Sequence, residues 1–110
     1  MKILVLIKQV PHGESPFDIS PDGSEILFSE YTSYGINSYD TYALEEALLV
    51  SEKISGTAIS VATIGTSAAE ISVRRALAMG AHEAYLIIGH KAEELSPLEK
   101  AEILAEFCAS

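Results

Sequence analysis

The feature that most constrains this chain is a continuous apolar run at residues 2–10, KILVLIKQV, which is rich in β-branched side chains. A run without polar alternation is typical of a strand that is buried on both faces, as in the middle of a parallel sheet. Two further strand-like runs, at residues 57–64 and 83–88, each follow an amphipathic segment. Strands that alternate with helices predict right-handed crossovers and a parallel sheet, so the predicted fold class is α/β.

The first helix is expected where a polar turn, residues 36–42, runs into an apolar stripe. Ser38 is one candidate for its N-cap and Asp40 competes with it, while Gly56 is the expected stop. The predicted inward side chains of this helix are Ala43, Ala47, Val50 and Ile54, with Leu44, Leu48 and Ser51 beside them.

Two capping boxes mark the starts of the second and third helices. Ser67 stands three residues before Glu70, and Ser96 stands three residues before Glu99, with proline at the first position of the third helix. Gly80 fits the end of the second helix. The expected inward side chains are Ile71, Val73, Leu77 and Ala78 in the second helix, and Leu98, Ala101, Leu104, Ala105 and Cys108 in the third.

Residues 12–30 form an excursion between the first strand and the first helix. Two short strand-like runs, at residues 17–20 and 25–28, flank the turn sequence Pro21-Asp22-Gly23. Glycine supplies the positive φ that such a turn requires. We therefore expect a small hairpin arm on the surface.

Charge and cysteine content narrow the classes of partner. The 110 residues carry 16 acidic and 7 basic side chains, a net charge of −9, whereas nucleic acids and anionic membranes need clustered lysine and arginine. The one cysteine, Cys108, excludes an internal disulfide and fits a reducing compartment. No run approaches the roughly 18 apolar residues of a membrane span. The expectation is a cytoplasmic domain that binds no nucleic acid and does not insert into a membrane.

The predicted sheet is incomplete by the standard of Rossmann-like folds. In those folds the first three strands lie in the order 3-2-1, and a fourth joins the other side of strand one, where the ligand binds. This sequence contains only three such strands, which leaves the apolar first strand at a free edge. We infer that residues 1–110 are the N-terminal part of a single larger α/β domain, or that a partner covers this edge.

Three segments in order resemble one protein family. They are MKILVLIKQVP at residues 1–11, INSYDTYALEEA at residues 36–47 and RRALAMGA at residues 74–81. With this spacing, nearly the whole chain resembles the N-terminal part of the β subunit of electron-transfer flavoprotein. The family usually has Asn-Pro where this chain has Asn37-Ser38, and Asp after Val-Pro where this chain has His12-Gly13. These differences leave the identity of the partner open.

The resemblance implies an adenine-nucleotide α-hydrolase-like fold, with helices on both faces of a Rossmann-like sheet. It implies an electron carrier subunit and not an enzyme. Such a subunit binds AMP, or an extra FAD in electron-bifurcating relatives, and pairs with an FAD-carrying α subunit. The resulting heterodimer shuttles electrons from acyl-CoA or other dehydrogenases to a quinone oxidoreductase.

The family's nucleotide contacts fall, in this sequence, on the end of the first strand, the polar turn and the end of the second strand. The implied cofactor-binding residues are Leu6, Asn37, Ser38, Tyr39, Asp40 and Ile64. Leu6 and Ile64 would pack on the adenine, while Asn37 and Asp40 would bond polar atoms of the ribose or base. From spacing alone, Asn37 and Asp40 are turn and cap residues, and Leu6 and Ile64 belong to the core in any case. The family's phosphate-binding loop follows the fourth strand.

No spacing in the chain indicates catalysis or metal binding. There is no Ser/His/Asp or Cys/His arrangement, no Gly-x-Gly-x-x-Gly pattern and no Walker A pattern. His12, His82 and His90 are scattered through loops, which favours surface histidines over a metal site. Arg74 and Arg75 are favoured as surface residues over phosphate ligands.

Two other functions are compatible with the residues alone. One is a stand-alone, stress-type nucleotide-binding α/β module that homodimerises, whose Gly-rich phosphate motif would follow a fourth strand. The other is a scaffold that only holds a partner. Flavin absorbance and co-purification with an α subunit separate the electron carrier from both.

Overall fold

The computed structural model describes residues 1–89 and 91–110, so the expectation for His90 lies outside the described residues. The fold is α/β, as predicted, and its main sheet is parallel. The three strands of this sheet lie in the order β1-β6-β7, which places β1 at an edge. Their bounds are Lys2–Leu6 for β1, Ala58–Gly65 for β6 and Glu83–Ile88 for β7.

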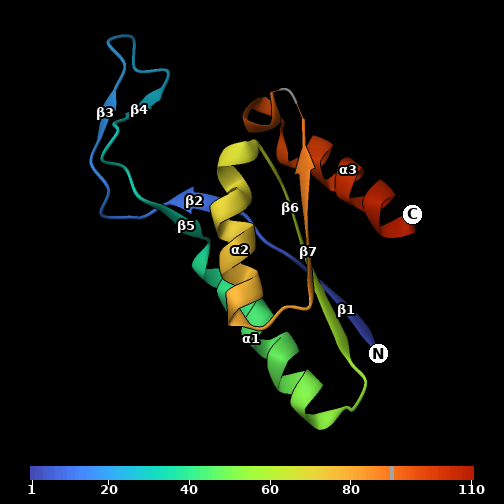
Figure 1. Cartoon of the computed structure of the whole chain (residues 1–110). Helices are drawn as coiled ribbons and strands as arrows, with labels where there is room; N and C mark the ends of the chain where they lie inside the picture. The colour runs from blue at the N-terminus through green and yellow to red at the C-terminus, as the bar shows by residue number, and fades with distance from the viewer. Residues whose placement is uncertain (90) are drawn as a thin grey trace.

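Helices lie on both faces of the main sheet (Figure 1). On one face, α1 contacts β1 and β6, and α2 contacts β6 and β7, whereas α3 lies on the opposite face. Short 3-10 turns, η1 and η2, precede α2 and α3. None of the helices in the described residues is long and apolar enough to cross a bilayer. The bounds are Ser38–Lys53 for α1, Ser67–Ala69 for η1, Glu70–Met79 for α2, Ala92–Glu94 for η2 and Pro97–Ala109 for α3.

The hydrophobic core lies between the sheet and the helices α1 and α2. Val5 and Val61 lie opposite one another in the strand register, and both are buried. Side chains alternate between the faces of a strand, so Leu6 points toward α3, and it is 42% exposed. The core cluster consists of Val5, Ile7, Leu44, Ala47, Ile59, Val61, Ala76 and Ala81.

The opposite face of the sheet is only thinly covered by α3. Phe107 of α3 packs edge-on against Tyr85 of β7, with ring centroids 5.2 Å apart, but no residue of α3 is buried. The capping box predicted at the start of this helix is confirmed. Of its predicted inward stripe only Leu104 is half-buried, and the prediction is wrong for the other four, since Leu98, Ala101, Ala105 and Cys108 are exposed. A sheet of three strands is narrow, and most of the helix surface therefore has nothing to pack against.

The inward faces of α1 and α2 also differ from the prediction. In α1, Leu44 and Ala47 are buried, whereas Ala43 is exposed. The capping box predicted at Ser67 is wrong, because Thr66 caps η1 and α2 begins only at Glu70. The buried residues of α2 are Ser72, Val73 and Ala76, whereas Ile71, Leu77 and Ala78 are exposed. Small side chains thus form much of the surface by which α2 approaches the sheet.

The apolar run at residues 2–10 is not one strand. β1 ends at Leu6, and the chain then leaves the main sheet as β2, which pairs antiparallel with β5. The predicted hairpin is confirmed, with β3 paired to β4 around a turn in which Gly23 has a φ of 76°. Residues 9–36, called the arm below, project away from the sheet (Figure 1). The bounds are Gln9–Pro11 for β2, Phe17–Ile19 for β3, Ile26–Phe28 for β4 and Tyr34–Ile36 for β5.

Candidate functional site

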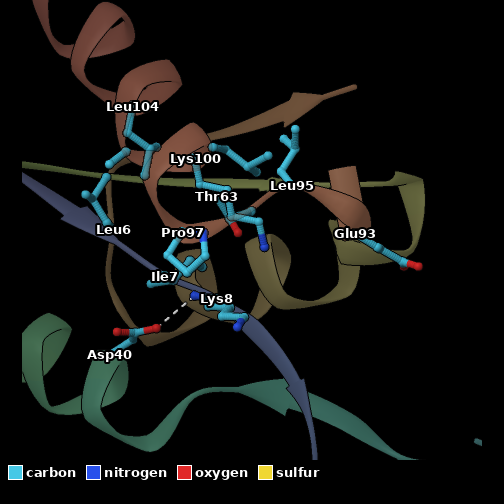
Figure 2. Close-up of a pocket in the computed structure, with 12 residues that line it drawn as sticks. Leu6, Ile7, Lys8, Asp40, Thr63, Glu93, Leu95, Pro97, Lys100 and Leu104 are labelled. Atoms are coloured by element: carbon cyan, nitrogen blue, oxygen red, sulfur yellow. Dashed lines mark hydrogen bonds between the residues drawn. The ribbon is translucent and has the colours of Figure 1, made fainter. Parts of the chain in front are cut away.

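Two hydrogen bonds, both formed by the backbone of Lys8, join the end of β1 to the start of α1. The Asn37 N–H donates to the Lys8 carbonyl at 2.8 Å, and the Lys8 N–H donates to Asp40 Oδ2 at 2.8 Å. Figure 2 shows the second bond as a dashed line between the strand and the helix. Because both bonds meet at Lys8, the chain that leaves β1 is held against the first turn of α1. The structure therefore brings together the strand end and the polar turn, which are far apart in the sequence.

Asn37 caps α1, and neither Ser38 nor Asp40 does so. The Asn37 Oδ1 accepts a hydrogen bond from the Tyr39 N–H at 2.9 Å. Ser38 is the first helical residue, and its carbonyl accepts from the Thr41 hydroxyl at 2.6 Å. The predicted cap is thus wrong by one residue, and Asp40 instead bonds the strand end through its carboxylate.

A cavity of about 480 Å³ opens between the carboxyl ends of β1 and β6 and the start of α3. This volume lies within the range of about 300–1,000 Å³ that is typical of small-molecule sites. Figure 2 shows Leu6 and Leu104 on one side of it, with Asp40 and Lys8 below and Lys100 reaching over from α3. The lining is mostly apolar, with a few charged groups, which is the pattern of a site for a small organic ligand.

A second cavity, of about 400 Å³, adjoins the first on the side of the arm. The two cavities share Lys8, Ile64, Glu93 and Lys100. The base of the arm contributes Phe28 and Tyr34, whose rings pack edge-on with centroids 6.4 Å apart. The arm therefore forms one wall of the space in front of the sheet.

A partly buried hydrogen bond fixes the wall of the second cavity at β2. The Ser72 hydroxyl donates to Gln9 Oε1 at 2.5 Å, and Gln9 Nε2 donates to the Ala68 carbonyl at 3.3 Å. Ser72 is almost fully buried, so it cannot turn to solvent for another partner. These contacts tie the beginning of the arm to η1 and α2.

Three of the six implied cofactor-binding residues meet at the first cavity. Leu6, Asp40 and Ile64 line it, whereas Asn37, Ser38 and Tyr39 do not. Tyr39 is 78% exposed and packs edge-on against Tyr42, with ring centroids 6.4 Å apart. Contact of any of the six residues with a nucleotide stays a prediction.

Two lysines of the cavity were not identified from the sequence. Lys8 and Lys100 both line it, although the chain has only seven basic residues. Lys8 follows the end of β1 at Leu6 by two residues, and the carboxyl ends of parallel strands are where ligands bind, but the sequence placed Lys8 inside the expected strand. No local pattern reveals Lys100, whose position depends on how α3 lies across the sheet.

Two other polar residues singled out in the sequence, His82 and Arg74, have structural roles. The Ile59 N–H donates to His82 Nδ1 at 2.9 Å, and the His82 N–H donates to the Ile59 carbonyl at 2.8 Å. Arg74 forms an exposed ion pair with Glu70, one helical turn earlier, at 2.7 Å. Across residues 1–89 and 91–110, there is no group of three or more side chains that could hold a metal ion.

Comparison with known families and proteins agrees with the resemblance found in the sequence. The electron transfer flavoprotein domain family matches residues 26–110. The electron transfer flavoprotein subunit beta of Thermoanaerobacterium thermosaccharolyticum is 46% identical over 87 residues, which cover 79% of this chain and 32% of that protein. The subunit beta of Methylophilus methylotrophus is 32% identical over 107 residues, which cover 96% of this chain and 40% of that protein.

A third relative is named for a larger assembly. The caffeyl-CoA reductase-Etf complex subunit CarD of Acetobacterium woodii is 39% identical over 87 residues, or 79% of this chain and 32% of that protein. The chain thus spans about a third to two fifths of the length of these relatives.

Proposed function

The chain belongs to the electron transfer flavoprotein family, and we propose that it acts there as a β-type subunit, an electron carrier and not an enzyme. The flavin of such a carrier supplies the redox chemistry, and the protein supplies binding and orientation. The observation that carries the proposal is the convergence of Leu6, Asp40 and Ile64 on one cavity in a chain whose sequence matches this family.

The ligand proposed for this cavity is an adenine nucleotide, either AMP or an FAD of the electron-bifurcating type. Leu6 and Ile64 offer apolar surface for the flat adenine, and the Asp40 carboxylate offers an acceptor for a ribose hydroxyl or the adenine amino group. Lys8 and Lys100 are the lining residues that can attract phosphate. The residues present therefore suit the group in shape and in charge.

The proposed working unit is a heterodimer in the cytoplasm. Its other member would be an FAD-carrying α subunit, and its electron donors would be acyl-CoA or other dehydrogenases. We also propose that these 110 residues belong to a larger nucleotide-binding domain, in which a further strand pairs with the open edge of β1. The edge position of this apolar strand and the partial coverage of the relatives support that view.

The nucleotide content of the complex tests the proposed function. The larger subunit that we propose contains these residues is co-expressed with the α-type subunit of its own organism, and the nucleotide released on denaturation is quantified by chromatography. Leu6→Asp should reduce the nucleotide retained by the purified complex at least about tenfold, because it places a charge against the adenine face of the cavity. Leu49→Asp is the matched control, since Leu49 is 43% exposed, about as much as Leu6 at 42%, and lies outside the cavity.

Two results would overturn this proposal. One is a purified complex of the unmodified larger subunit that contains neither AMP nor flavin. The other is a Leu6→Asp complex that retains as much nucleotide as the Leu49→Asp complex, because the cavity would then not be the nucleotide site.

A further inference from the structure

A histidine side chain takes the place of a strand partner at the start of β7. The Ile59 N–H in β6 donates to His82 Nδ1 at 2.9 Å, and the Ile59 carbonyl accepts from the His82 N–H at 2.8 Å. The register of β6 with β7 begins at Ser60 and Glu83, so these two bonds lie just before the first paired residues. His82 thus extends the contact between the two strands by one residue, with its ring in the place of a backbone carbonyl.

The first of these bonds fixes the protonation state of the ring. A backbone N–H can only donate, so His82 Nδ1 must accept with its lone pair and carries no proton. The folded chain therefore holds His82 as the neutral imidazole with its proton on Nε2. A proton added to Nδ1 would remove the acceptor and would direct two donors toward one another.

The surroundings of Ile59 make the loss of this acceptor unfavourable. Ile59 is fully buried, and a buried N–H that loses its partner keeps the cost of desolvation without a compensating bond. The residue before the ring is also held, because Ala81 is buried and its N–H donates to the Ala76 carbonyl at 3.2 Å. His82 itself is exposed, so its ring can exchange a proton with solvent.

We propose that His82 is a proton-sensitive latch, whose neutral ring holds the start of β7 against β6 and whose protonation releases it. Histidine is the side chain that changes its charge between about pH 5 and pH 8. The unfolded chain takes up this proton without losing a bond, whereas the folded chain must first break the contact with Ile59. The unfolded state therefore binds more protons over this range, and the free energy of unfolding falls as the pH falls.

The charged groups around the ring act on it with opposite signs. His82 lines a third cavity, of about 580 Å³, at the amino ends of the strands. Lys2 of β1 disfavours a further positive charge there, whereas Glu83 of β7 attracts one. The other titratable side chains of this cavity are Tyr85 of β7 and Cys108 of α3.

Glu83 gives the latch a rival with the opposite effect on stability. Its carboxylate accepts from the Tyr85 hydroxyl at 2.9 Å, and this bond together with the Glu83 charge raises the pKa of Tyr85, so Tyr85 stays neutral where histidine titrates. An ion pair between a protonated His82 and Glu83 would stabilise the folded chain as the pH falls. The sign of the pH effect therefore distinguishes the latch from the ion pair.

The test compares the stability of the unmodified chain and of His82→Asn at about pH 7.5 and about pH 5. The asparagine Oδ1 offers an acceptor on the same side-chain carbon as the histidine Nδ1, but it does not titrate. Urea denaturation followed by circular dichroism gives the unfolding equilibrium constant of each. On the change to low pH, this constant should rise at least about tenfold more for the unmodified chain, because the carboxylates contribute equally to both proteins.

Two further variants control for the loss of a histidine and for the loss of the acceptor. His12 is exposed like His82, but its ring packs over Gly35 at the base of the arm, so His12→Asn should keep the full pH response of the unmodified chain. His82→Ala has no acceptor for the Ile59 N–H. It should unfold more readily than His82→Asn at both pH values and should lack the additional response.

The tautomer of the ring gives a readout that does not depend on stability. Long-range proton–nitrogen NMR correlation spectra at about pH 8 should show a proton on Nε2 of His82 and none on Nδ1. As the pH is lowered, the amide resonance of Ile59 should shift together with the ring resonances of His82, because protonation breaks the bond that joins them.

Three results would overturn the latch. The first is a proton on Nδ1 of His82 at about pH 8. The second is an equal pH response of the unmodified chain and His82→Asn, and the third is a smaller response of the unmodified chain, which would show the ion pair with Glu83. The proposed function stands in each case, because His82 lines neither of the two cavities of the candidate site.

Discussion

Lys8, Asn37 and Asp40 decide how the end of β1 meets the start of α1. The backbone of Lys8 accepts from the Asn37 N–H and donates to the Asp40 carboxylate, so both of its polar groups are satisfied at the helix terminus. This arrangement directs the Lys8 backbone toward the helix and leaves its side chain at the cavity. Lys8 and Asp40 therefore serve both the fold and the candidate site, whereas Asn37 serves the fold.

Loss of the Asn37 side chain, which caps α1, should destabilise the protein, whereas loss of the Ser38 side chain should not. Asn37→Ala leaves the Tyr39 N–H without its acceptor and should lower the free energy of unfolding by about 1 kcal/mol. Ser38→Ala, which changes the neighbouring exposed residue, should alter it by less than about 0.5 kcal/mol. Urea denaturation followed by circular dichroism measures both. Equal losses for the two variants would show that Ser38 shares the capping role.

The sequence alone could not decide between these caps. Asn37, Ser38 and Asp40 are all common N-cap residues, and local propensity gives them similar weight. Asp40 does not act as the cap because its carboxylate accepts a hydrogen bond from the N–H of Lys8, 32 positions away in the chain. The resemblance pointed to Leu6, Asp40 and Ile64 among the six implied residues. The position of the Asp40 carboxylate, however, depends on its nonlocal contact with Lys8.

The elements themselves were largely predictable, whereas their faces were not. The apolar runs, the apolar stripes and the turn sequence predicted three parallel strands, three helices and a hairpin, and the structure contains all of them. β5 was missed because a strand of three residues is defined by its partner β2, not by its own composition. The inward face of α2 was missed because it is built from Ser72 and Ala76, which carry little hydrophobic signal.

The junction between α1 and α2 depends on one glycine. Gly80 ends α2 with a φ of 131°, and a Cβ there would lie 2.8 Å from Leu48 Cδ2 of α1. Gly80→Ala should lower the free energy of unfolding by about 1–3 kcal/mol, because it adds backbone strain to a clash between the helices. Gly13→Ala is the control, since a Cβ at Gly13 meets nothing within 4 Å and no positive φ is required. Thermal unfolding of both variants checks the prediction, which a Gly80→Ala protein as stable as the control would contradict.

The whole molecule combines a packed sheet with an arm that lacks a core. Its principal extents are 54 × 29 × 19 Å, and the arm projects to one side (Figure 1). The turn at Gly23 predicted the hairpin. The length of the arm was not predictable, because the pairing of β2 with β5 joins segments on either side of the hairpin. The arm thus begins at Gln9 and not after the expected end of the first strand.

The difference between the packed main sheet and the exposed arm should appear directly in amide hydrogen exchange. β6 is paired with β1 on one side and β7 on the other and contains Ile59, Val61 and Ala62, which are fully buried, so its amides should exchange slowest. The amides of β3 and β4 should exchange fastest among the strands, because opening this hairpin exposes no buried apolar surface.

Hydrogen-exchange mass spectrometry of the chain, at a concentration where it is monomeric, measures this order of exchange. β6 is held on both edges by neighbouring strands and is covered by buried side chains, so its amides become exposed only when the sheet itself opens. Exchange in β3 and β4 as slow as exchange in β6 would contradict the exposed arm.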